Sequence, residues 1–242
     1  MIPRILLDKT ETPDGGKELC LYQHDRDFFM CVGNLELMSS RTHGSEEALA
    51  RLALERIEKH KHTRVLIGGL GMGFTLRAAL DVLPDTARVV VAELVPAVVK
   101  WNRGPLADLA GHPLDDQRVD VREVDAAKII RGGNGSYDAI LLDVDNGPAG
   151  LSRHGNNWFY RFTGLTAILA ALQPKGVLAL WSAGQDPAFT RRMSDAGFAV
   201  ETVRVRARAG GKGAHHVIWI ATKKPVLVPG KAERNFRAEA EL

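Results

Sequence analysis

The sequence predicts an α/β protein with a mostly parallel sheet, a C-terminal antiparallel hairpin and a small β-rich segment in front. Two observations support this. Strand and helix patterns alternate from about residue 64 to residue 196, which is typical of parallel βαβ units. Two strand-like runs, at 200–205 and 216–221, then follow each other without a helix pattern between them.

Length and composition limit the size of the core and the number of domains. The chain has 242 residues, of which 45% are apolar, and a formal net charge of +3. This suits one large core, and the mild charge argues neither for nor against a nucleic-acid partner. We expect three parts: a small β-rich segment at 1–44, a main domain at 45–224, and a flexible tail at 225–242.

The location is predicted from what the sequence lacks. No run approaches the roughly 20 apolar residues of a membrane span, and the first residues have no signal-peptide core. The 2 cysteines have neither disulfide-framework nor metal-site spacing. We therefore expect a reduced, cytoplasmic protein without a membrane or metal site.

The first third of the chain is predicted to change from strand to helix. Short strand patterns occur at Leu19–Gln23 and Phe28–Val32. An amphipathic helix is expected from about Glu46 to His60, with Ser45 as its N-cap. The main-domain strands that follow are expected at 64–67, 88–93, 118–125, 137–143 and 176–181.

A glycine-rich turn after the strand at 64–67 is the centre of the predicted site. Gly69, Gly71 and Gly73 form a G-x-G-x-G pattern between a buried strand and a helix. Glycines there allow positive φ and let a ligand approach the backbone. The dinucleotide fingerprint G-x-G-x-x-G fails in both registers, since Phe74 or Leu76 would have to be glycine. The pattern instead resembles the first motif of S-adenosylmethionine (AdoMet) transferases.

Carboxylates follow the next strands at the edge where open α/β sheets bind ligands. Glu93 ends a strand about 20 residues after the glycines, the spacing at which an acid reaches ribose hydroxyls; the alternative is a solvated strand end. Asp125 is placed for an adenine amino group, or is the N-cap of the next helix. Asp143 and Asp145 follow the fourth strand and are the catalytic candidates, although Asp145 would also suit a turn.

Two weaker candidates lie in loops. His43 precedes the first main-domain helix and could reach a ligand, or be an exposed loop histidine. Trp158 belongs to a polar and aromatic loop that is either a lid over the substrate or an ordinary connection.

Over roughly residues 30–222, these motifs resemble the spermidine synthase-like family of AdoMet-dependent transferases. The resemblance is carried by residues 68–73, Glu93, Asp125-Ala126, 137–143 and 147–149. It implies a class I AdoMet-methyltransferase-like (Rossmann-like) fold and a possible homodimer. It also implies that the glycines hold the methionine part of the cofactor, Glu93 the ribose, and Asp125 with Ala126 the adenine, while Asp143 lies beside an acceptor amine.

The sequence departs from that family at three places. The family's D-x-x-D-P run is here Asp143 to Asn146 with the second acid displaced, and its Tyr-His-Glu run is here residues 45–47, of which only Glu47 matches. The acid usual in its glycine motif is replaced by Met72. Glu47 and Asn146 are kept as weaker substrate-binding candidates.

Three functions are compatible with this pattern. The altered motifs favour an AdoMet-dependent methyltransferase acting on a small, amine-containing metabolite. The resemblance favours a polyamine aminopropyltransferase that uses decarboxylated AdoMet. A third possibility is a non-catalytic adenosine-ligand binding or RNA-modifying protein. The sequence has neither the N-P-P-Y-type run nor the strong basic face expected of a nucleic-acid base methyltransferase. In each transferase, Asp143 would orient an amine and accept its proton, assisted by Asp145.

Overall fold

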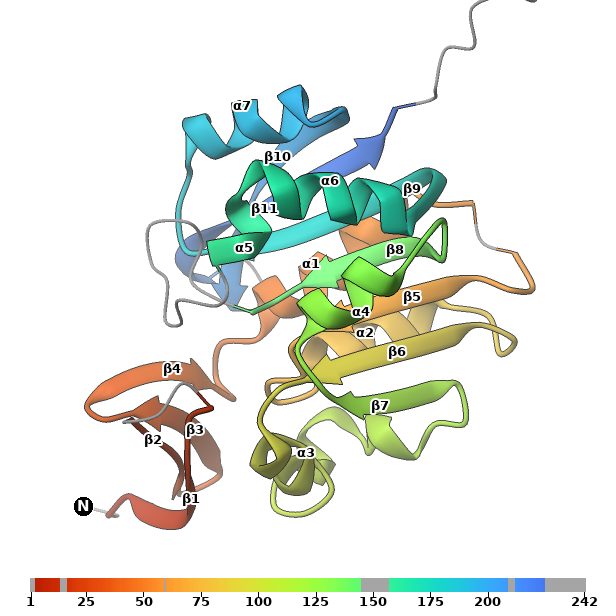
Figure 1. Cartoon of the computed structure of the whole chain (residues 1–242). Helices are drawn as coiled ribbons and strands as arrows, with labels where there is room; N and C mark the ends of the chain where they lie inside the picture. The colour runs from red at the N-terminus through yellow and green to blue at the C-terminus, as the bar shows by residue number, and fades with distance from the viewer. Residues whose placement is uncertain (1–2, 14–16, 59, 145–156, 209–211, 225–242) are drawn as a thin grey trace, which may run out of the picture.

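The chain folds into two sheets, a small N-terminal one and a large central one (Figure 1). The computed structural model describes residues 3–13, 17–58, 60–144, 157–208 and 212–224. The predicted tail at 225–242 lies outside this part of the chain.

The N-terminal sheet contains four antiparallel strands in the order β1-β2-β3-β4. They are β1 (Ile5–Glu11), β2 (Glu18–His24), β3 (Asp27–Val32) and β4 (Leu35–Ser39). The two predicted strands, β2 and β3, are confirmed and supply the buried apolar residues of this sheet. Strand β1 has no buried residue, and β4 has one, Ser39, so neither has the apolar pattern that identifies a buried strand.

The central sheet has seven strands in the order β10-β11-β9-β8-β5-β6-β7. Its members are β5 (Arg64–Gly68), β6 (Arg88–Glu93), β7 (Val119–Glu123), β8 (Tyr137–Leu142), β9 (Leu172–Ser182), β10 (Phe198–Arg208) and β11 (Lys212–Lys223). All the predicted strands are present. The predicted hairpin is also confirmed, and β11 lies between β9 and β10, antiparallel to both.

Helices cover both faces of this sheet. One face carries α1 (Gly44–Leu54), α2 (Phe74–Val82) and α3 (Pro96–Asn102), and the other carries α4 (Ala126–Gly132), α5 (Asn157–Tyr160), α6 (Phe162–Ala171) and α7 (Pro187–Asp195) (Figure 1). Strand residues alternate between the two cores: Val65 and Ile67 face the first layer, and Leu66 faces the second. Two 3₁₀ turns, η1 (Ala107–Ala110) and η2 (Pro113–Asp115), follow α3. Within the described residues, no helix is long and apolar enough to cross a membrane.

Helix α1 differs from the prediction at both ends. It ends at Leu54, earlier than expected, and its N-cap residue is His43, which makes no side-chain capping bond. Ser45 therefore lies inside the first turn, where it is fully buried, and is not the N-cap. Its hydroxyl donates to Glu46 Oε2 at 2.7 Å, so the serine hydrogen-bonds a side chain and does not cap the helix.

The N-terminal sheet is attached to the central domain through α3 and the glycine-rich turn. The indole N–H of Trp101 on α3 donates to Asp8 Oδ2 at 2.9 Å, and Lys100 pairs with the same carboxylate at 3.2 Å. Met38 of β4 lies over Gly71, since a Cβ built on that glycine would be 2.7 Å from Met38 Cε. The small sheet thus forms one wall beside the turn.

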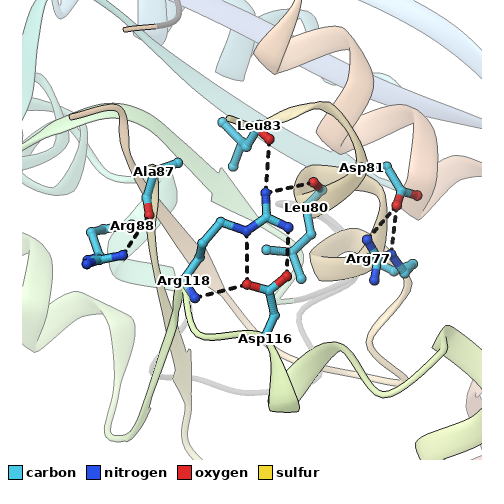
Figure 2. A network of polar contacts seen from close by, with 8 residues as sticks. All are labelled: Arg77, Leu80, Asp81, Leu83, Ala87, Arg88, Asp116 and Arg118. Atoms are coloured by element: carbon cyan, nitrogen blue, oxygen red, sulfur yellow. Dashed lines mark hydrogen bonds and ion pairs between the residues drawn. The ribbon is translucent and has the colours of Figure 1, made fainter. Parts of the chain in front are cut away.

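Arg118 ties the end of α2 to the strand β7 (Figure 2). Its guanidinium is largely buried and donates to the main-chain carbonyls of Leu80 and Leu83 at 3.0 and 2.9 Å. The same group binds both carboxylate oxygens of Asp116 and lowers the pKa of that acid to about 2. Arg118 therefore satisfies carbonyls that the end of the helix leaves without partners.

We predict that Arg118→Met lowers the free energy of unfolding by about 2–3 kcal/mol, because it leaves two buried carbonyls without a donor and takes the guanidinium away from Asp116. The melting temperature should fall by roughly 5–10 °C. Arg122 is the matched control, since it also pairs with an aspartate two residues earlier but is about half exposed. Equal losses from Arg118→Met and Arg122→Met would contradict this role for the buried arginine.

Candidate active site

The glycine-rich turn is held directly against the end of β8. The N–H of Gly69 donates to Ala92 O, and the N–H of Asp143 donates to Gly68 O, both at 2.9 Å. Gly69 has φ +86°, and a Cβ there would collide with the carbonyl oxygen of Asp143. Only glycine permits this approach, and it places the turn and Asp143 side by side.

A buried asparagine, Asn102, contacts both Gly71 and Gly73. The side-chain amide of Asn102 on α3 donates to Gly71 O at 2.8 Å and to Val98 O at 2.9 Å. Gly71 and Gly73 both have positive φ, at 55° and 85°. A Cβ on Gly73 would lie 3.1 Å from Asn102 Oδ1, so this glycine packs against protein. No motif in the sequence marks Asn102, because its partners are main-chain atoms.

Glu93 ends β6 and is only 8% exposed. Its carboxylate accepts from the N–H of Leu70 at 2.9 Å and from the N–H of Val95 at 2.8 Å. Burial raises the pKa of Glu93, while hydrogen bonds from main-chain N–H groups oppose that rise. The solvated strand end, considered as an alternative, is therefore wrong: the side chain is buried and joins β6 to the glycine-rich turn.

Asp125 is the N-cap of α4, which confirms one of its two predicted roles. Its Oδ1 accepts from the N–H of Ala127 at 2.8 Å. Ala126 is buried at the start of the same helix, and its Cβ would lie 3.1 Å from a Cβ on Gly68. Asp125 and Ala126 thus adjoin the strand that leads into the glycine-rich turn, and their adenine role stays a prediction.

Asp143 follows β8 and is half-buried. Its Oδ2 accepts from the hydroxyl of Thr75, on the first turn of α2, at 3.3 Å. Loss of solvation raises the pKa of Asp143 to about 6, against a smaller lowering by the Thr75 hydrogen bond. Asp143 is therefore a stronger base than an ordinary aspartate, yet it is mostly ionised at neutral pH.

A second acid, Glu46, lies in this cluster and was not among the predicted site residues. It is only 8% exposed, and its main-chain oxygen lies 3.3 Å from the same Thr75 hydroxyl. Burial, and then the negative charge of Asp143, raise the pKa of Glu46 to about 8. A signal was present in the sequence: Glu46 precedes Leu49, Ala50 and Ala53 by three, four and seven residues, so it lies on the apolar face of α1.

Three of the weaker candidates have partners of their own, and two cannot be placed. His43 stacks on Phe74 with ring centroids 4.2 Å apart, and its Nδ1 lies 2.8 Å from Glu47 Oε1. Trp158 instead packs over Arg131, in the last turn of α4, with the guanidinium carbon 4.3 Å from the ring centroid. Asp145 and Asn146 lie outside the described residues.

The arrangement combines three chemical properties at one edge of the sheet. The glycine-rich turn exposes backbone beside a buried acid, Glu93, which suits a ligand that approaches the main chain closely. Two further acids, Asp143 and Glu46, lie near the turn, and the negative charge of Asp143 raises the cost of ionising Glu46. Such a pair favours a bound cation, which would relieve that cost, and can exchange a proton near neutral pH.

The raised pKa of Glu46 predicts a pH dependence of stability. The folded state holds this proton more tightly than the unfolded state, so the contribution is present below the unfolded pKa of 4.5 and is lost as the pH rises through about 8. We expect Glu46→Gln, which cannot ionise, to lose less melting temperature than the wild type between about pH 6 and pH 9. Thermal melts across that range measure this. Glu47→Gln is the control, and identical pH slopes for the wild type and Glu46→Gln would show that Glu46 ionises freely in the fold.

Comparison with known proteins finds similar sequences among the polyamine aminopropyltransferases. Residues 42–196 match the spermine/spermidine synthase domain. A polyamine aminopropyltransferase of Oceanobacillus iheyensis is 27% identical over 184 residues, covering 73% of this chain and 33% of its own length. Polyamine aminopropyltransferase 1 of Streptomyces coelicolor is 33% identical over 131 residues, covering 53% of this chain and 24% of its own. The chain thus spans a third or less of these relatives.

The fold is also found among solved structures. Spermidine synthase from Thermotoga maritima superposes with a TM-score of 0.71 at 18% identity, covering 91% of this chain and 73% of that one. A spermidine synthase in complex with the transition-state analogue AdoDATO gives a TM-score of 0.70 at 18% identity, with the same coverage. The predicted fold class is confirmed, and the family match spans most of the main domain. The chain belongs to the spermine/spermidine synthase family.

Proposed function

We propose that this protein is an aminopropyltransferase of the polyamine type, which moves an aminopropyl group from decarboxylated AdoMet to an amine acceptor. The observation that carries the proposal is the contact between the glycine-rich turn and Asp143. This contact places a carboxylate beside the loop that would hold the donor. The polyamine aminopropyltransferases among the relatives support this choice.

The preference for methyl transfer, which came from the altered motifs, loses its support. The family match and the named relatives favour aminopropyl transfer, the alternative reading of the sequence. The folded chain also gives one of the altered motifs a role. Glu46 stands where the family's run has histidine, and it brings a second acid to Asp143. The pair of acids expected from the D-x-x-D run is thus supplied in part by another element.

The residues around the turn fit an adenosine-bearing donor. Space over Gly71 is bounded by the flexible end of Met38 rather than by main chain, so a slender ligand could lie there after a small side-chain movement. Glu93 would face the ribose hydroxyls while keeping its hydrogen bond to Leu70 N, since a carboxylate accepts more than two hydrogen bonds. Asp125 and Ala126 would lie beside the adenine.

The chemistry asks little of the protein beyond positioning and proton removal. The donor supplies a sulfonium, which is already a strong leaving group. An alkyl amine is mostly protonated at neutral pH, with a pKa near that of lysine at about 10.4, so it must lose a proton before it can attack. Asp143 would bind the ammonium, align it with the donor carbon and accept that proton. The nitrogen–carbon bond forms as the carbon–sulfur bond breaks, and the bonding pair leaves with sulfur.

Donor binding is tested first by thermal stability. Decarboxylated AdoMet at about 100 times its dissociation constant should add roughly 2.7 kcal/mol, which is seen as a melting shift. We expect a larger shift with decarboxylated AdoMet than with AdoMet, and none with NAD. A shift with AdoMet alone would contradict aminopropyl transfer, and a shift with NAD alone would exclude both transferase readings.

The ribose role of Glu93 is tested by Glu93→Gln. We expect donor affinity to fall at least tenfold, because the amide would place donors against the main-chain N–H groups and the ribose. Glu123→Gln is a matched control, since Glu123 pairs with Glu93 in register but is exposed on β7. Affinity is measured by calorimetry on folded variants. Unchanged affinity in Glu93→Gln would remove the ribose assignment.

Asp143→Asn separates binding from turnover. The amide keeps the size of the side chain and its contact with Thr75 but is not a base, so we expect near wild-type donor affinity and at least a hundredfold loss of turnover. Asp120→Asn, at an exposed position on β7, should leave both quantities unchanged. Full turnover in Asp143→Asn would mean that the acid is structural.

A further inference from the structure

A chain of hydrogen bonds leads from the pair of acids to a half-buried histidine on β11. Glu46 Oε2 lies 2.7 Å from Ser45 Oγ, and Ser45 Oγ lies 2.9 Å from His216 Nδ1. Ser45 is completely buried, whereas His216 is partly accessible. The edge of Trp181 on β9 meets the His216 ring at a centroid distance of 4.7 Å and limits its rotation. Three exchangeable groups thus run in a line from the site towards solvent.

The two hydrogen bonds can be arranged in two ways, which differ by the transfer of one proton. In the first, protonated Glu46 donates to Ser45, and the serine hydroxyl donates to neutral His216. In the second, the serine hydroxyl donates to ionised Glu46, and protonated His216 donates to the serine. Passing from the first to the second breaks the Glu46 O–H bond, exchanges the proton on the serine oxygen, and forms an N–H bond on His216.

Burial keeps both ends of the chain neutral before the exchange. Burial lowers the pKa of His216 and raises the pKa of Glu46, so neither group is held in its charged form at neutral pH. The charged or titratable neighbours of Glu46 are Asp143 at the end of β8 and Glu47 on α1. The α2 neighbour is Thr75, an uncharged hydroxyl.

We propose that Glu46, Ser45 and His216 form a proton relay that releases one proton to solvent for each proton that Asp143 takes from the acceptor amine. The origin of that proton rests on the proposed function. When Asp143 takes the proton from the ammonium, its negative charge disappears and no longer opposes ionisation of Glu46. Glu46 then releases its own proton through Ser45 to His216, and from there to solvent. One proton enters at Asp143 and one leaves at His216, so charge and proton number balance.

Ser45, Glu46 and His216 act through Asp143 in this scheme, and they are positioning and proton-carrying groups for the reaction. The first test therefore uses a readout that needs no activity. Nuclear magnetic resonance of the histidine rings in the full chain follows the titration of His216. We expect its midpoint to shift by roughly half a pH unit or more in both Glu46→Gln and Ser45→Ala. His215, which is exposed on the same strand, should titrate unchanged.

The second test measures turnover of decarboxylated AdoMet with a series of linear diamines between about pH 6 and pH 9. Ser45→Ala and His216→Gln should lose about tenfold in turnover with little change in KM, and Ser45→Thr, which keeps the hydroxyl, should recover most of it. His215→Gln should match the wild type. Melting temperatures confirm that each variant is folded.

The two tests separate the relay from the proposed function. If the wild type transfers nothing to any diamine, the proposed function fails, and the His216 titration alone decides whether the relay exists. A His216 midpoint that is unmoved by both Glu46→Gln and Ser45→Ala overturns the relay. Wild-type turnover in Ser45→Ala also overturns it, because a chain without the hydroxyl cannot pass a proton along this route.

Discussion

The close approach of Gly69 to the carbonyl oxygen of Asp143 is the constraint on which the site depends. It joins the turn after β5 to the end of β8, two neighbouring parallel strands, at a distance that excludes even a methyl group. Glu93 holds the same turn from β6 through Leu70 N, and Asn102 holds it from α3 through Gly71 O. The turn is therefore fixed from three sides, which is the preorganisation that an in-line displacement needs.

The second organising feature is electrostatic. Glu46 and Asp143 lie on different elements, α1 and β8, and the hydroxyl of Thr75 on α2 contacts the main-chain oxygen of the first and the carboxylate of the second. Placing two acids in a largely buried site is costly, and a bound ammonium group would offset that cost. The two acids therefore give the site an electrostatic preference for a cationic amine, although they come from other positions than the family pattern predicts.

The strands and the glycine-rich turn could be predicted because each is encoded locally. Buried parallel strands are continuous apolar runs, and Gly69 marks a positive φ. The long-range contacts could not be predicted. The sequence predicts Ser45 as a helix N-cap. In the structure the helix begins at Gly44, and the Ser45 hydroxyl hydrogen-bonds to Glu46 and to His216, which lies 171 residues away in the sequence. Glu46 has a signal in its place on the apolar face of α1, but a glutamate in the first turn of a helix is usually explained by the helix dipole.

The most direct test of the account is the mass of the product. The purified chain is incubated with decarboxylated AdoMet or with AdoMet, each together with a linear diamine, and the acceptor is analysed by mass spectrometry. We expect the diamine to gain one aminopropyl group from decarboxylated AdoMet and a methylthioadenosine co-product to form in equal amount, with Asp143→Asn giving neither. A methyl group gained from AdoMet, with no product from the decarboxylated donor, would contradict it.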